Sequence, residues 1–86
     1  MSDTIEAKIR SVAANIRKIR EYRDYTQEYL ALKLNISQNA YSKIELGYTK
    51  ITVERLFQIA DILEFDVTEL LGMEEDLKNL QAVANA

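Results

Sequence analysis

The stretch TQEYLALKLNISQNAYSKIELG, residues 26–47, decides the fold of this 86-residue chain. In its first half, Leu30, Ala31 and Leu34 recur at the three- and four-residue spacing of a helix that buries one face. Thr26 stands immediately before this pattern, where a side-chain oxygen can accept a hydrogen bond from a free backbone N–H. The first half therefore predicts a short helix with Thr26 as its N-cap.

The second half of the stretch predicts a tight turn and another short helix. Asn35 is the non-glycine residue that best tolerates the left-handed backbone closing a helix, and Ser37 can cap the helix that follows. We expect that helix to run from Gln38 to about Leu46 and to stop at Gly47. Residues 26–47 thus form a helix, a turn and a helix.

A long helix is predicted before this stretch. It is expected to run from about Thr4 to about Tyr22, and Asp3 with Glu6 has the spacing of a capping pair at its start. Its apolar stripe consists of Ile5, Ile9, Val12, Ala13, Ile16 and Ile19.

Two more helices are predicted after the stretch. Thr52 can cap a fourth helix, and Asp66 with Glu69 can cap a short fifth helix that ends at Gly72. The fourth helix is expected to fill one inward face with Val53, Leu56, Phe57, Ile59, Ala60 and Leu63. A tail with an apolar stripe at Met73, Leu77, Leu80 and Ala84 suggests a short helical end. Because no segment shows the alternation of apolar and polar residues that is typical of a strand, the expected fold is an all-α, compact domain of five helices.

The composition excludes several classes of protein. The chain has no Cys and no His, so thiolate or histidine metal sites and histidine-containing catalytic triads are ruled out. No glycine-rich phosphate loop or paired carboxylates stand out. We therefore expect no enzyme, catalytic residue, cofactor, metal or small-molecule ligand. The absence of Cys fits a reducing cytosol, so a cytoplasmic protein is expected. No apolar run approaches the roughly 20 residues of a membrane span.

The segment 15–71 resembles the helix-turn-helix domain of the lambda repressor and Cro family, also called the xenobiotic response element family. Residues 1–14 would then extend the first helix, and residues 72–86 would form a C-terminal tail. The resemblance is carried by Ile19-Arg20-Glu21, Thr26-Gln27-Glu28-Tyr29-Leu30-Ala31, Ile36-Ser37-Gln38, Tyr41-Ser42-Lys43-Ile44-Glu45, Gly47, Leu56 to Leu63 and Glu69-Leu70-Leu71.

The resemblance implies that the third helix reads double-stranded DNA in the major groove. Its outer face would carry Gln38, Asn39, Ser42 and Lys43. Gln and Asn can pair with adenine, and Lys can donate to guanine. The residues placed near backbone phosphates are Thr26, Gln27, Ser37, Tyr48 and Lys50.

Two further roles follow from the resemblance. Gln27 would also brace Gln38, and Arg20 with Glu45 would form a structural ion pair between the first and third helices. The sequence departs from the common pattern at Asn35, Leu46, Ile51 and Glu64. Leu46 replaces a residue that is usually polar or basic, which removes one phosphate contact and leaves an apolar group for a partner subunit.

The chain's net charge of −3 conceals an uneven distribution. Residues 1–50 hold nine basic and six acidic residues, whereas residues 51–86 hold two basic and eight acidic ones. A mildly basic half that binds DNA and an acidic half that faces away are therefore expected. The predicted function is a transcriptional regulator, a repressor that binds as a homodimer through its fifth helix and tail. The alternative is an antitoxin or interaction module that binds a partner protein as well as its own operator.

Overall fold

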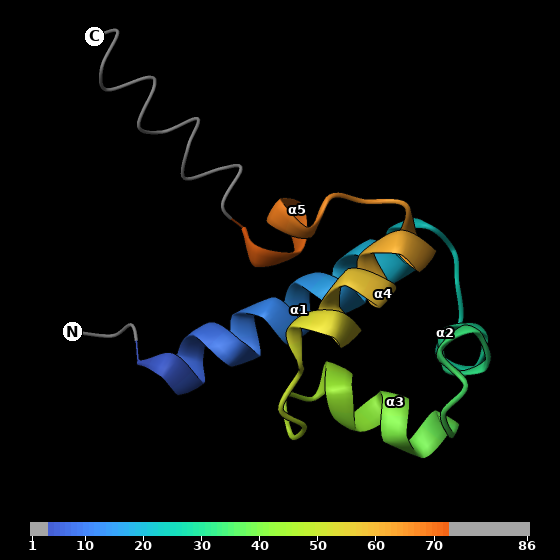
Figure 1. The fold of residues 1–86 in the computed structure, drawn as a ribbon, viewed down its shortest axis with the longest axis horizontal. Helices are drawn as coiled ribbons and strands as arrows, with labels where there is room; N and C mark the ends of the chain where they lie inside the picture. The colour runs from blue at the N-terminus through green and yellow to red at the C-terminus, as the bar shows by residue number, and fades with distance from the viewer. Residues whose placement is uncertain (1–3, 73–86) are drawn as a thin grey trace, which may run out of the picture.

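The computed structural model describes residues 4–72 of the chain and shows five helices in this part (Figure 1). They are α1 (Ile5–Tyr22), α2 (Gln27–Leu34), α3 (Gln38–Glu45), α4 (Val53–Leu63) and α5 (Val67–Leu71). The described residues contain no strand, and the predicted all-α fold is confirmed. The helical tail predicted for residues 73–86 lies outside the described residues.

Side-chain caps start the helices at the expected places, with one correction. Thr26, Ser37 and Thr52 cap α2, α3 and α4, each accepting a backbone N–H at 3.0 Å. The correction concerns the start of α1, which the sequence predicted to be capped by Asp3 with Glu6. Thr4 is the N-cap, and its Oγ1 accepts the N–H of Ala7 at 3.1 Å.

The capping pair predicted for α5 is present. The backbone N–H of Asp66 donates to Glu69 Oε1 at 3.2 Å, and the side chain of Asp66 caps the helix in return. At the other end, Gly72 closes α5 with a φ of 77°.

Left-handed residues close α2 and α4 and follow the C-cap of α3. Asn35 closes α2 with a φ of 59°, as predicted. Helix α3 ends one residue earlier than predicted, with Leu46 as its C-cap, and Gly47 follows with a φ of 80°. Glu64 closes α4 with a φ of 58°, so a charged residue occupies a backbone conformation that favours glycine.

The core lies where all five helices meet. Its completely buried large side chains are Ile16, Leu30, Tyr41, Ile59, Leu63 and Leu70. Ala31 is 3% exposed, and its small side chain allows α2 and α3 to approach closely. Arg23, at the end of α1, donates to the carbonyls of Leu63 at 2.7 Å and Glu64 at 3.0 Å, which fixes the end of α4 against α1. The helix-turn-helix thus packs against α1 and α4, which together with α5 hold it in place.

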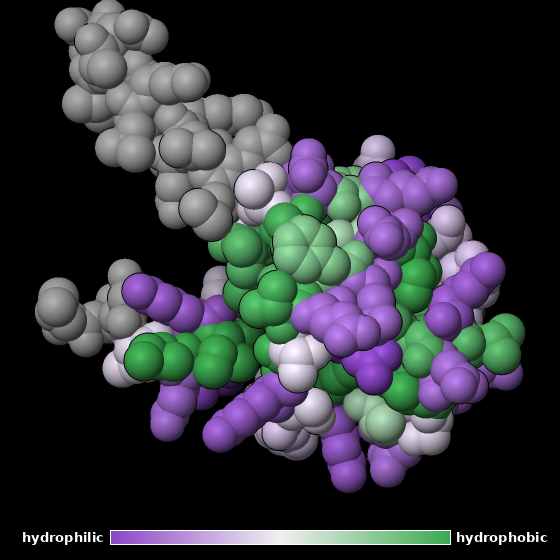
Figure 2. Space-filling view, viewed as in Figure 1, coloured by the Kyte–Doolittle hydropathy of each residue, from purple (hydrophilic) through white to green (hydrophobic). Residues whose placement is uncertain are grey.

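Several apolar residues that the sequence pattern placed in the core lie at the surface instead. Val53 is 71% exposed and Phe57 is 53% exposed, so the predicted inner face of α4 is wrong at these two positions. Ile5 and Ile9 are also exposed, because the first turns of α1 project beyond the other helices (Figure 1). Figure 2 shows hydrophobic side chains at the surface over α4 and α5 and near the N-terminal end of α1.

Candidate nucleic-acid interface

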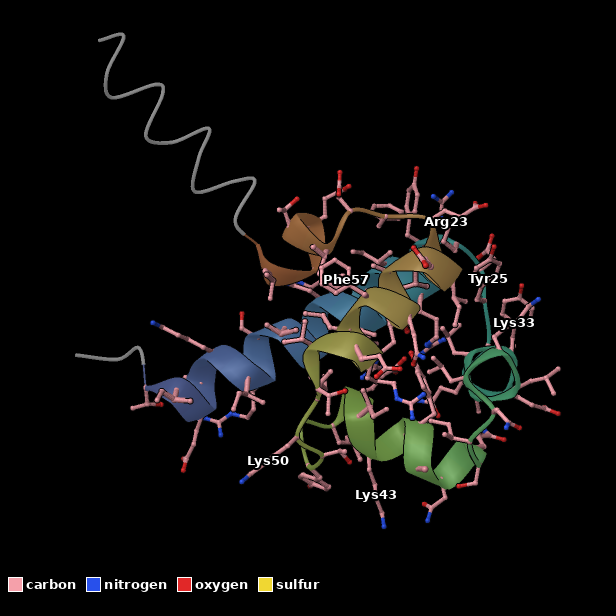
Figure 3. The ribbon with its side chains drawn as sticks, viewed as in Figure 1. Arg23, Tyr25, Lys33, Lys43, Lys50 and Phe57 are labelled. Atoms are coloured by element: carbon pink, nitrogen blue, oxygen red, sulfur yellow. The ribbon has the colours of Figure 1, made fainter. Side chains whose placement is uncertain are left out.

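The outer face of α3 presents polar side chains to solvent. Gln38, Asn39 and Lys43 are exposed and Ser42 is half-buried, whereas Tyr41 on the opposite side of the helix is completely buried. Lys43 points away from the body of the molecule (Figure 3). Amide, hydroxyl and ammonium groups on one short helix can form hydrogen bonds with the edges of base pairs.

The first turns of α2 and α3 supply hydroxyl groups and free backbone donors. The Oγ atoms of Thr26 and Ser37 accept hydrogen bonds from Tyr29 and Ala40, respectively, and each hydroxyl keeps its own proton to donate. The positive end of each helix dipole also favours an anion at these positions. Both termini are therefore suited to a phosphate oxygen.

The loop between α3 and α4 brings further groups beside α3. Tyr48 and Lys50 are exposed, and Lys50 extends from the same side of the molecule as Lys43 (Figure 3). A shallow hollow separates this loop from α3. Its polar lining residues are Ser37, Asn39, Lys43, Thr49, Lys50, Thr52 and Arg55.

Arg55 is a member of this lining that the sequence did not single out. Its guanidinium donates to the carbonyl of Leu34 at 3.4 Å and to Gln58 Oε1 at 3.2 Å, which holds it at the junction of α2 and α4. A lone arginine in an amphipathic helix has no motif that distinguishes it from a solvated residue. Only the packing of α4 against α2 places it beside the hollow.

A buried ion pair connects α1 with the end of α3. Arg20 Nε donates to Glu45 Oε2 at 2.6 Å, and Arg20 Nη2 donates to Glu45 Oε1 at 3.1 Å. The side chains are 11% and 3% exposed, respectively. Arg20 Nη1 also donates to the carbonyl of Tyr25 at 2.8 Å, so the guanidinium fixes the α1–α2 connection as well.

The amide of Gln27 joins this pair. Its Nε2 donates to Glu45 Oε1 at 3.1 Å, whereas the resemblance placed this side chain against Gln38. The carboxylate of Glu45 therefore receives donors from both α1 and α2. Because it is buried and paired, its negative charge is not presented on the outer face of α3.

The surroundings of Glu45 determine its charge state. Burial by itself would raise the pKa of its carboxyl, but the hydrogen bonds from Arg20 and Gln27 outweigh burial and lower that pKa from its ordinary value. The hydrogen bond to Glu45 correspondingly raises the pKa of Arg20. Beside them, burial raises the pKa of the Tyr41 hydroxyl. The pair is thus charged on both sides at neutral pH.

The described part of the chain holds neither a metal-binding cluster nor a membrane-spanning helix. Residues 4–72 contain no group of three Asp or Glu side chains placed to hold a metal ion. Within the same residues, no helix has the length and apolar character needed to cross a membrane.

The fold and the polar outer face of α3 define a small all-helical domain built around a helix-turn-helix. The chain belongs to the helix-turn-helix family, whose model matches residues 16–70. The family resemblance found in the sequence is thereby confirmed.

Curated relatives include transcriptional regulators of two bacteria. The chain is 40% identical over 65 residues to the cryptic phage CTXphi transcriptional repressor RstR of Vibrio cholerae, covering 76% of this chain and 55% of that protein. It is 34% identical over 67 residues to the uncharacterized HTH-type transcriptional regulator YqaE of Bacillus subtilis, covering 78% of this chain and 58% of that protein.

A third relative is the HTH-type transcriptional regulator AnsR of Bacillus subtilis, 30% identical over 60 residues, covering 70% of this chain and 52% of that protein. The chain thus spans about half the length of the curated relatives it matches. No solved structure gave a significant match.

Proposed function

We propose that this chain is a sequence-specific, double-stranded DNA-binding transcriptional regulator that acts as a repressor. The observation that carries the proposal is the exposed polar face of α3, held in place by the buried pair of Arg20 and Glu45. Family membership and the names of the relatives support it. A repressor of this kind acts by occupying its operator and blocking the promoter.

The proposed contacts divide into two kinds. Gln38, Asn39, Ser42 and Lys43 contact base edges in the major groove and determine the preferred sequence. The residues proposed to contact phosphates are Thr26, Gln27, Ser37, Tyr48 and Lys50. Phosphate contacts supply affinity and register on the duplex but carry no sequence information directly.

Paired alanine substitutions test this division. Gln38→Ala is expected to cost about 1 to 3 kcal/mol and to relax the preference at one base position. Lys50→Ala is expected to weaken binding to all sequences alike and to reduce the slope of log affinity against log salt by about one. Lys18→Ala, an exposed position on α1, is the control for loss of one charge.

The assay is fluorescence anisotropy with a panel of single-base operator variants at several salt concentrations. Identical behaviour of Gln38→Ala and Lys50→Ala across that panel would show that the assignment of readout and positioning roles is wrong. An effect of Lys18→Ala as large as that of Lys50→Ala would mean that total charge, and not position, governs affinity.

We also propose that the regulator binds as a homodimer, because one helix-turn-helix offers few base contacts and two half-sites lie roughly 34 Å apart in such operators. The exposed Val53, Phe57 and Leu71 on α4 and α5 support an apolar contact between the two copies. Phe57 lies on α4, away from Lys43 and Lys50 (Figure 3). The tail that the sequence also suggested for this contact lies outside the described residues.

Sedimentation equilibrium tests the dimer. Phe57→Ser is expected to shift the mass from dimer toward monomer while leaving the helical circular dichroism signal intact, because this side chain is already half in water. Leu32→Ser is the matched control, because Leu32 is an apolar side chain of α2 that is 75% exposed. A monomeric mass of the unsubstituted chain, both free and with operator DNA, would refute the homodimer.

The remaining assignments are part of the same proposal. In this proposal, residues 15–71 are the DNA-binding domain, residues 1–14 are the N-terminal extension, and residues 72–86 are the C-terminal tail. The proposed protein is cytoplasmic and is not an enzyme. The antitoxin alternative receives no support from the relatives, whose names describe regulators of transcription.

A further inference from the structure

The extended part of α1 contacts the loop that follows α3. Gly47 has a φ of 80°, and a Cβ added at this glycine would lie 3.2 Å from Cγ of Arg10 and 4.0 Å from Cβ of Ala13. The absence of a side chain at Gly47 therefore allows the loop backbone to pack directly on α1. Arg10 lies outside the segment 16–70 that matches the family.

This packing creates a second hollow, between α1 and the loop. Its lining residues are Glu6, Ile9, Arg10, Leu46, Gly47, Tyr48, Thr49 and Lys50. Thr49 and Lys50 also line the hollow beside α3, so the two hollows meet at this loop. The loop that follows α3 and reaches Lys50 is thereby brought next to Arg10.

The two cations of the second hollow are free to bind an anion. Arg10 and Lys50 are both exposed, and neither forms a hydrogen bond or an ion pair with another side chain in the part of the chain that the structure describes. The hydroxyls of Tyr48 and Thr49 add neutral donors at the same place. Glu6 also lines this hollow, and its carboxylate opposes the binding of an anion.

We propose that Arg10 and Lys50 together bind a phosphate group of the DNA backbone, so that the extension of α1 lengthens the contact of each subunit with the operator. The inference rests on the proposed DNA-binding function. A guanidinium presents planar paired donors that match a phosphate, and an adjacent ammonium adds a second charge. Arg10 is thus a positioning residue that the family motif does not contain.

The test uses the full chain and a duplex that carries its selected operator. Arg10→Ala is expected to lower affinity about threefold to tenfold at 0.1 M salt and to reduce the salt slope by about one, without changing the base preference. Lys8→Ala is the matched control, because Lys8 is an exposed cation of α1 that is not part of the hollow. Glu6→Gln is expected to increase affinity, since it removes the opposing charge.

Ethylation interference locates the contact on the DNA. With the unsubstituted chain, ethylating the phosphate that Arg10 and Lys50 contact should weaken binding. Arg10→Ala should reduce the interference at that phosphate alone, because Lys50 still contacts it. Equal behaviour of Arg10→Ala and Lys8→Ala, or unchanged affinity with Glu6→Gln, overturns this inference while leaving the proposed function intact. Failure of the unsubstituted chain to prefer any duplex sequence would instead refute the proposed function.

Discussion

Glu45→Gln is the substitution that most sharply tests how the helix-turn-helix is held in place. The change keeps the shape of the side chain but removes the charge that faces Arg20. In the folded protein, the Arg20 side chain is only 11% exposed and forms two hydrogen bonds with this carboxylate. After the substitution, the guanidinium stays buried beside a neutral amide, with the carbonyl of Tyr25 as its other partner.

The magnitude follows from burial. Removing one partner of a buried ion pair typically costs about 3 to 5 kcal/mol. Because Arg20 keeps its bond to Tyr25, we expect the lower end, about 3 kcal/mol. A chain of this size has a total stability of roughly 4 to 13 kcal/mol, so the loss is a large share of it.

Urea denaturation followed by circular dichroism measures this loss. The matched control is Glu21→Gln, which breaks the exposed pair of Arg17 and Glu21, whose side chains are 61% and 54% exposed. We expect the control to cost less than about 0.5 kcal/mol. A loss below about 1 kcal/mol for Glu45→Gln would refute the claim that this buried pair fixes α3 to α1.

Replacing both partners separates the effect of an unpaired buried charge on stability from the effect of side-chain packing. Arg20→Met combined with Glu45→Leu removes both charges and keeps apolar volume, so the double variant is expected to be more stable than Glu45→Gln. A double variant that loses more stability than Glu45→Gln would indicate that most of the loss comes from the missing hydrogen bonds of Arg20 and Glu45, and not from an unpaired buried charge.

Three further predictions concern the charge of Glu45, the left-handed residues that close two helices, and the core. The pKa of Glu45 is lowered on folding, so its stabilising contribution is complete above its unfolded pKa of about 4.3 and is lost as pH falls through the lower folded pKa. Urea midpoints between pH 7 and pH 3 should therefore fall less steeply for Glu45→Gln than for the unsubstituted chain, and equal slopes would contradict the pKa assignment. Glu64→Gly should stabilise the protein by about 1 kcal/mol in thermal denaturation, because Glu64 has a φ of 58°. Asn35→Gly, at a φ of 59°, should stabilise the protein less than Glu64→Gly, because Asn tolerates the left-handed conformation better than Glu. A larger stabilisation by Asn35→Gly would show that backbone strain does not distinguish the two sites. Leu63→Ala should cost about 2 to 5 kcal/mol in urea denaturation, since Leu63 is completely buried, and a loss below about 1 kcal/mol would mean that the core collapses around the gap.

Most of the fold could be predicted from the sequence, because helix ends have local chemical signals. Thr26, Ser37 and Thr52 are short hydroxyl side chains placed directly before apolar periodic runs, and each caps a helix. Asn35 ends α2 as its tolerance of left-handed backbone predicts. These features depend on residues only a few positions apart.

The errors arose where burial depends on distant elements. Helical spacing shows that Phe57 lies on one side of α4 with other apolar residues, but it cannot show whether another helix covers that side. The same holds for Ile5, whose turn of α1 projects beyond its neighbours. Periodicity thus identified the helices and overestimated the width of the buried face.

The part of the candidate site that lies within the helix-turn-helix motif could be predicted from the sequence. The exposed positions of Gln38, Asn39 and Lys43 follow from the period of α3, whereas their contacts with DNA stay a prediction. The role of Arg10 depends on the packing of Gly47 against α1, a contact between residues 37 positions apart in the sequence. No local pattern signals such a contact.

The central claim is that the outer face of α3 reads a DNA sequence, and selection of bound duplexes from a random pool at 0.1 M salt tests it most directly. The account predicts that the unsubstituted chain enriches a motif with two half-sites, and that Gln38→Ala retains the motif except at one base position in each half-site. Enrichment of no motif, or of an identical motif by Gln38→Ala, would contradict it.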